Sequence, residues 1–168
     1  MGNDSAKLSE EGLQEFMQEI DRMHHRDDQH VTEPHLVTHS EDAYWLTGGT
    51  DNPSHLGLLR HVPMKTVEFV LQVIPAETST DLQRHVHESV HYVADGGGWS
   101  EIGDQVVTWS KGDFVFTPPW IWHRHYANSE DVHMIIIENS RLLNSLDAGR
   151  RESRGKVSFA EEFGVQDT

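Results

Sequence analysis

The spacing of apolar residues changes once along the chain. Between Ser9 and about His24, apolar side chains recur every three or four residues, which predicts an amphipathic helix capped by Ser9. The residues that follow, up to Pro34, are polar and aperiodic, as is typical of a linker. From His35 onward, apolar and polar residues alternate with a period of two, which is typical of half-buried β-strands. The pattern therefore predicts one helix, a linker and a β-rich region.

Short strands separated by turns are predicted after the linker. Their ranges are 35–37, 43–46, 66–74, 84–87, 90–94, 106–109, 114–117, 122–126 and 132–138. Glycine, aspartate and asparagine mark the turns between them, and many short strands at close intervals predict an all-β sandwich or barrel. The 168-residue length suits a single domain. We expect an N-terminal helix and polar linker (1–34), a barrel (35–143) and a C-terminal tail (144–168).

Composition excludes several classes of protein. No stretch reaches the roughly 18–20 apolar residues of a membrane span, and the N-terminus lacks the blocks of a signal peptide, so we expect a cytoplasmic protein without membrane contact. The chain has no cysteine, which excludes disulfides, thiolate metal sites and cysteine nucleophiles. A formal net charge of -15 disfavours nucleic-acid binding. The unusual feature is the number of histidines, 13.

Two histidine pairs have a spacing suited to metal binding. His85 and His87 are separated by one residue in a predicted strand, so their side chains should share a face. His123 and His125 repeat this spacing in a later predicted strand. One such pair alone is more often two surface histidines, but two pairs joined by glycine-containing turns favour a shared ion. Imidazole nitrogen suits Fe(II), Mn(II), Ni(II), Cu(II) and Zn(II), so the spacing does not select the metal.

The residues from His85 to Asn128 resemble the two sequence motifs of the cupin superfamily. Within that superfamily, HVHESVHYV followed by WSKGDFVFTPPWIWHRHYAN is most similar to the ring-cleaving gentisate 1,2-dioxygenase group. The resemblance implies a single cupin barrel, that is, a double-stranded β-helix or jelly roll. It also implies that His85, His87 and His123 are the ligands of Fe(II), with His125 near the site.

Two features depart from the family pattern. Most cupins carry a glutamate ligand at the position of His91, which leaves three roles open for this residue: a fourth ligand, a hydrogen-bond partner of a ligand, or an acid or base. Gentisate dioxygenases also usually contain two cupin domains in a longer chain, so this sequence resembles a single-domain relative.

We therefore expect an Fe(II)-dependent dioxygenase that uses O2 to cleave a C–C bond of a gentisate- or hydroquinone-like aromatic compound or of a dicarbonyl compound. Three neutral imidazoles leave the metal its charge and open positions for an anionic bidentate substrate. His91 and His125 are the predicted catalytic bases for the substrate hydroxyl. Two alternatives stay open: a non-oxidative metal-dependent lyase, isomerase or cyclase, and a non-catalytic ligand-binding or small subunit of a larger dioxygenase.

The remaining expectations concern the substrate and the assembly. The predicted substrate-contacting residues are Trp122, Phe116, Tyr92 and Gln72. Arg84 and Arg124 should point away from the metal, because strand alternation places them opposite the histidines. We expect a homodimer or higher homo-oligomer, with a heteromeric partner as an alternative.

Overall fold

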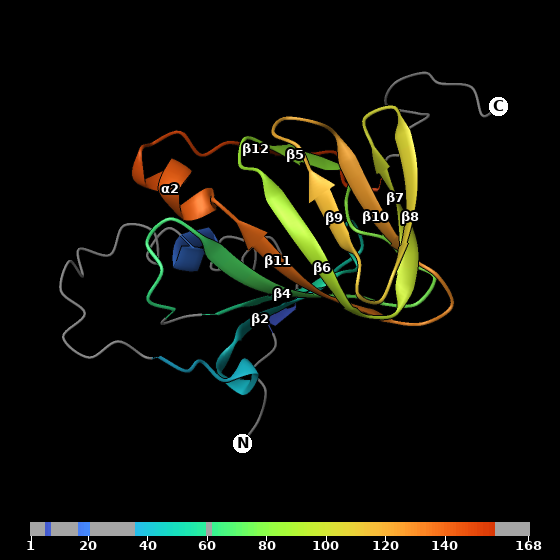
Figure 1. The fold of residues 1–168 in the computed structure, drawn as a ribbon, viewed down its shortest axis with the longest axis horizontal. Helices are drawn as coiled ribbons and strands as arrows, with labels where there is room; N and C mark the ends of the chain where they lie inside the picture. Colours follow the sequence, from blue (N-terminus) through green and yellow to red (C-terminus); the bar gives the residue numbers. More distant parts are fainter. Residues whose placement is uncertain (1–5, 8–16, 21–35, 60–61, 157–168) are drawn as a thin grey trace.

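Two β-sheets face each other and enclose the core of the protein (Figure 1). The computed structural model describes residues 6–7, 17–20, 36–59 and 62–156. The first sheet has the strand order β1-β2-β3-β4-β11-β6-β9, with bounds Ala6–Lys7, Tyr44–Thr47, His55–Leu58, Glu68–Ile74, Val132–Glu138, Ser89–Asp95 and Phe114–Thr117. The second has the order β12-β5-β10-β7-β8, with bounds Arg151–Ser153, Gln83–His85, His123–Ala127, Gly97–Ile102 and Gln105–Ser110. A short 3-10 helix, η1 (Ser40–Asp42), and the helix α2 (Ser140–Ser145) flank the sheets. The expected all-β cupin-type barrel is thus confirmed.

Alternating burial decides which side chains face the interior. Every second residue of β4, starting at Glu68, is buried, and β11 and β6 follow the same pattern along their buried positions. The three strands pair antiparallel with one another, so their buried side chains form one continuous inner wall. The second sheet supplies the opposite wall, mainly from β10 and β7.

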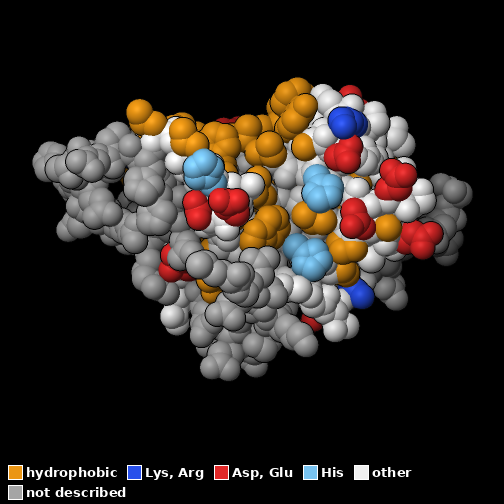
Figure 2. Space-filling model, turned by 90° about the horizontal axis from the view of Figure 1, so that it is seen from below, with side chains coloured by type: hydrophobic (Ala, Val, Ile, Leu, Met, Phe, Trp, Pro, Cys, Tyr) orange, Lys and Arg blue, Asp and Glu red, His pale blue; other side chains and the backbone are white. Residues whose placement is uncertain are grey.

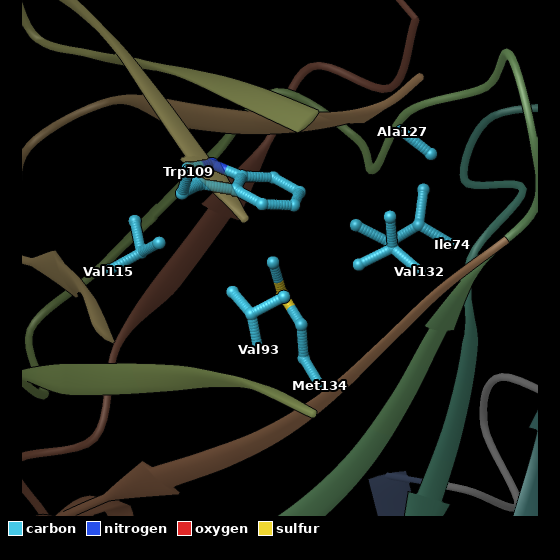
Figure 3. Close-up of a cluster of buried hydrophobic side chains, with 7 residues drawn as sticks. All are labelled: Ile74, Val93, Trp109, Val115, Ala127, Val132 and Met134. Carbon is cyan, nitrogen blue, oxygen red and sulfur yellow. The ribbon is translucent and has the colours of Figure 1, made fainter. Parts of the chain in front are cut away.

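The apolar core fills one part of the space between the sheets (Figure 3). It consists of Ile74, Val93, Trp109, Val115, Ala127, Val132 and Met134. A second cluster, Leu46, Leu58, Val70 and Ile136, extends the core under β2 and β3. Fully burying side chains of this size stabilises a fold by about 1.5–3 kcal/mol each. The rest of the interior is polar and holds buried histidines.

The predicted strands match the structure best where alternation is regular. The predicted ranges 114–117 and 132–138 are confirmed as β9 and β11. The predicted strand 84–87 is wrong at its end, because β5 stops at His85. The predicted strand at 35–37 is wrong for residues 36 and 37, which form no strand. The strands β1, β3, β7 and β12 were not predicted.

The glycines explain why β7 is hidden in the sequence. Gly96, Gly97 and Gly98 predict a turn, yet β7 begins at Gly97. A side chain at Gly98 would overlap the carbonyl oxygen of Tyr126 and the ring of Trp109, so this glycine permits close packing within the sheet. Glycine here marks a close approach of strands instead of a turn.

The two ends of the chain contribute to the sheets as well. Ala6–Lys7 pairs parallel with β2, and β12 pairs antiparallel with β5. Residues 17–20 are helical, and Ile20 packs against the second apolar cluster; the rest of the predicted helix lies outside the described residues. No helix in the described part of the chain is long and apolar enough to span a membrane. On the face drawn in Figure 2, acidic side chains lie on both sides of a band of hydrophobic side chains.

Candidate metal centre

Five histidines form a row inside the polar part of the barrel. His85 ends β5, His87 follows it, His123 and His125 lie on β10, and His91 reaches the row from β6 in the opposite sheet. Neighbouring ring centroids are separated by 3.7 Å (His87–His85), 4.7 Å (His85–His123), 5.6 Å (His123–His125) and 4.4 Å (His125–His91). Both predicted histidine pairs and His91 are therefore brought together.

Backbone carbonyl groups fix the proton on two of these rings. The Nδ1 atom of His85 lies 2.8 Å from the carbonyl oxygen of His87, and that of His123 lies 2.9 Å from the carbonyl oxygen of Ile121. A carbonyl oxygen can only accept, so both Nδ1 atoms carry the proton and donate it. The Nε2 atom of each ring is left with a free lone pair, which is the form that binds a metal ion.

His87 is held differently, by a carboxylate. Its Nε2 atom lies 3.1 Å from an oxygen of Glu138, at the end of β11. Burial alone would raise the pKa of Glu138, but the hydrogen bond from His87 and the positive charge that His87 and His85 can carry lower it to about 2. Glu138 is therefore a carboxylate at neutral pH, directed at a predicted ligand. A lone glutamate after the apolar run MIII gave no signal for this role in the sequence.

Burial disfavours the charged form of four histidines of the row, namely His85, His91, His123 and His125. Desolvation, followed by repulsion from His87, lowers the pKa of His85 to about 4. Desolvation and then His123 lower the pKa of His91 to about 3. The pKa values of His123 and His125 are also well below the usual value, first because of burial and then because of neighbouring histidines. Neutral imidazoles are the species that coordinate metals.

The imidazole nitrogens of the row are suitable metal ligands chemically. Their positions, however, suit a shared metal ion only in part. Two imidazoles on one ion have ring centroids about 4.5–5.3 Å apart, given metal–nitrogen bonds of about 2.0–2.2 Å. The 4.7 Å between His85 and His123 satisfies this, and Nε2 of His123 is buried without a partner among the described residues. The parallel stack of His85 and His87 at 3.7 Å is too close.

Consequently, within residues 36–59 and 62–156 no group of three or more histidine or acidic side chains has the arrangement that a metal requires. A shared ion would need the His87 ring to leave its stack on His85. The set His85, His87 and His123 therefore stays a prediction, with His85 and His123 already in the right protonation form.

Of the predicted substrate residues, only Gln72 lies on the inner face. It is 3% exposed on β4, and its Oε1 atom has no hydrogen-bond partner in the described part of the chain. Tyr92 lies on the opposite face of β6 from His91, with its ring 5.0 Å from that of Phe114. Phe116 is 67% exposed and lines a groove of about 690 Å³ between β8 and β9, outside the histidine row.

Trp122 lies on the outer side of the second sheet, among arginines. The guanidinium carbon of Arg84 is 4.7 Å from the Trp122 ring and 4.4 Å from the Trp120 ring, and Arg84 also donates two hydrogen bonds to Glu152. Arg124 donates to the carbonyl oxygen of Gly155. Both arginines thus point away from the histidines, as strand alternation predicts.

A family match covers the central strands. Residues 69–138 are matched by the Cupin domain family. This part of the chain is therefore similar to cupin domains. Over 93 residues the chain is 35% identical to gentisate 1,2 dioxygenase 1 of Aquipseudomonas alcaligenes. The aligned residues make up 26% of that protein and 55% of this chain. Over 101 residues it is 29% identical to a gentisate 1,2-dioxygenase of Streptomyces sp, covering 58% and 27%. The chain spans about a quarter of the length of these curated relatives.

Solved structures share the fold of this part of the chain. A salicylate 1,2-dioxygenase from Pseudaminobacter salicylatoxidans superposes with a TM-score of 0.57 at 17% identity, covering 60% of this chain and 30% of that one. A cupin 2 conserved barrel domain protein from Rhodopseudomonas palustris gives a TM-score of 0.51 at 24% identity, covering 58% and 69%. The similarity to cupins, and among them to gentisate dioxygenases, is confirmed.

Proposed function

We propose that the cupin domain binds Fe(II) and forms the active site of a dioxygenase that uses O2 to cleave a C–C bond in a gentisate- or hydroquinone-like aromatic compound or in a dicarbonyl compound. The observation that carries the proposal is the pair of free Nε2 lone pairs on His85 and His123, whose rings lie 4.7 Å apart inside the barrel. The named relatives, gentisate 1,2-dioxygenases, support the type of reaction.

The metal would be held by Nε2 of His85, Nε2 of His123 and the ring of His87. Glu138 would orient His87, because a ligating histidine commonly gives its second ring N–H to a carboxylate or carbonyl group. When bound, Fe(II) would supply a redox-active Lewis acid for a chelating substrate and O2. The protein contributes a site with little water, since His123 and His125 are fully buried.

His91 is suited to move the proton that the substrate hydroxyl releases. Its Nδ1 atom is buried and has no partner among the described residues. Its Nε2 atom lies 3.2 Å from the hydroxyl of Ser89, which in turn contacts the hydroxyl of Thr117. His91 can therefore accept the proton at Nδ1 while its Nε2–H donates to Ser89. The two buried hydroxyls end at the carbonyl oxygen of Ser89, so the same Nδ1 atom would return the proton to the departing product.

The test combines metal binding with oxygen uptake. The purified chain, loaded with Fe(II) without oxygen, should bind about one iron and consume O2 with gentisate or hydroquinone. His123→Gln should abolish both, whereas His133→Gln removes an exposed histidine of β11 and should change neither. Turnover without O2 would indicate a non-oxidative cupin, and a chain that binds no iron would refute the proposal.

A further inference from the structure

A buried serine connects the histidine row to the apolar core. Ser100 on β7 is fully buried, and its Oγ atom lies 2.7 Å from Nδ1 of His125 and 2.7 Å from Nε1 of Trp109. His125 is also fully buried, and Trp109 is 6% exposed. No further hydrogen-bond partner of Ser100 Oγ occurs in the part of the chain that the structure describes. The three side chains therefore form a closed group in which each proton can be placed.

The indole fixes the direction of both hydrogen bonds. An indole N–H can only donate, so Trp109 donates to Ser100 Oγ. The hydroxyl of Ser100 has one proton, and Nδ1 of His125 is the acceptor within its reach. If Nδ1 of His125 carried the proton instead, the buried hydroxyl would have no acceptor, which lowers the population of that form by roughly tenfold or more. Ser100 therefore donates to Nδ1 of His125.

We propose that His125 presents an N–H group, and not a lone pair, to the interior of the barrel, and that Ser100 and Trp109 are the positioning residues that hold it in this form. With Nδ1 accepting from Ser100, the proton of the neutral ring is on Nε2. That Nε2 atom is buried and has no partner among the described residues. It is available to a bound molecule.

His125 thus differs from the two rings beside it. His85 and His123 donate through Nδ1 to carbonyl groups and present a lone pair at Nε2. Their tautomer is suited to a metal ligand, and that of His125 to a hydrogen-bond donor. The distance of 5.6 Å between the His125 and His123 rings does not distinguish a metal ligand from a hydrogen-bond donor. The ring nitrogen that carries the proton does.

The role in catalysis rests on the proposed function. A donor fixed beside the metal ligands would stabilise an anionic oxygen of the substrate, such as a phenolate or carboxylate, without any proton transfer. The sequence predicted a base at His125. The hydrogen bonds leave proton acceptance to His91, whose Nδ1 atom has no partner among the described residues while its Nε2 atom lies beside the hydroxyl of Ser89.

The tautomers can be measured directly in metal-free protein with ¹⁵N-labelled histidine. At about pH 8 histidine is neutral, and long-range ¹H–¹⁵N spectra distinguish a protonated Nδ1 from a protonated Nε2. The His125 signals are assigned by their loss in His125→Gln. We expect His125 to carry its proton on Nε2, and His85 and His123 on Nδ1. Protonation of His125 on Nδ1 would overturn the proposal.

Variants then test what holds His125 in this form. Ser100→Ala should shift its tautomer ratio by about tenfold toward a mixture. Ser110→Ala is the matched control, because this serine lies on β8 with an exposed side chain and should leave the ratio unchanged. An unchanged ratio in Ser100→Ala would overturn the positioning role. These spectra need neither iron nor O2, so their outcome is independent of the proposed function.

A binding measurement tests the donor role itself. In Fe(II)-loaded protein without O2, Ser100→Ala should bind gentisate about tenfold more weakly, because the ring no longer holds its N–H toward the ligand. Equal affinities of Ser100→Ala and the unsubstituted protein would remove the donor role of His125. If the unsubstituted protein has the expected tautomers but binds neither gentisate nor hydroquinone nor a β-diketone, the proposed function is refuted instead.

Discussion

Acid should unfold the metal-free protein in a pH range where most of its carboxylates are still charged. Four histidines of the row are both buried and lowered in pKa: His85, His91, His123 and His125. In the unfolded chain each regains a pKa near 6.5. Because the folded-state pKa lies below the unfolded one, the unfolded state binds more protons, and the folded state loses stability as the pH falls below 6.5.

The size of the effect follows from these pKa values. At about pH 5.5, one unit below the unfolded pKa, a histidine that stays neutral in the folded state lowers the free energy of unfolding by about 1.4 kcal/mol. Four such residues together lower it by about 6 kcal/mol, a large share of the 5–15 kcal/mol typical of a domain. Glu138 does not contribute in this range, because its stabilisation is lost only below the unfolded pKa of a glutamate.

Urea unfolding of the metal-free protein at about pH 7.5, 6.5 and 5.5 measures this loss. His91→Gln should reduce the loss between the highest and lowest pH by about 1.4 kcal/mol, since one buried histidine is removed. His133→Gln removes an exposed histidine and is the control. A free energy of unfolding that stays constant between about pH 7.5 and 5.5 would refute the conclusion that the row is buried and neutral.

Three further substitutions test other parts of the structure. Gly98→Ala should lower the free energy of unfolding by about 3 kcal/mol or more, because the new Cβ atom would overlap the backbone of Tyr126. The control Gly97→Ala, whose Cβ atom would have its nearest contact at 3.4 Å, should lower it by less than about 1 kcal/mol. Equal losses in the two variants would contradict the close approach of strands at Gly98. Asp81→Ala should lower the free energy of unfolding by about 2–3 kcal/mol in thermal or urea unfolding, because this buried carboxylate accepts hydrogen bonds from three other side chains. The control is Asp95→Ala, which removes an exposed carboxylate, and an equally small loss in Asp81→Ala would contradict the prediction. Glu138→Gln should weaken iron binding by about 10–100-fold, measured in competition with a chelator, because it removes the carboxylate beside His87. Glu88→Gln, at an exposed glutamate, is the control. An unchanged affinity in Glu138→Gln would show that His87 needs no carboxylate partner.

The fold could be predicted from the sequence where local alternation decides it. The strands β9 and β11 have regular alternation, and their predicted bounds were correct. The strand β7 was hidden because glycine usually marks turns, and only contacts with Tyr126 and Trp109 show why Gly98 belongs in a strand. The pairing of β12 with β5 joins residues that lie far apart along the chain, which no local pattern reveals.

The site could be predicted in its residue types but not in its contacts. Because successive side chains of a strand point to opposite faces, Tyr92 and its neighbour His91 cannot share a face. The structure has them on opposite faces of β6. The contacts of Glu138 with His87 and of Ser100 with His125 cross between strands or sheets. They depend on strand register, which the spacing of histidines along the sequence does not contain.

The two sheets contribute different kinds of residue to the histidine row and its surroundings. The rings with free Nε2 lone pairs belong to neighbouring strands of one sheet, whereas Gln72 and His91 come from β4 and β6 of the other. Libraries that vary the inward-facing residues of β4 and β6 would therefore change the surroundings of the histidine row while the donors on β5 and β10 keep their backbone supports. Under the proposed function, such libraries would vary the contacts to the substrate separately from the predicted metal ligands.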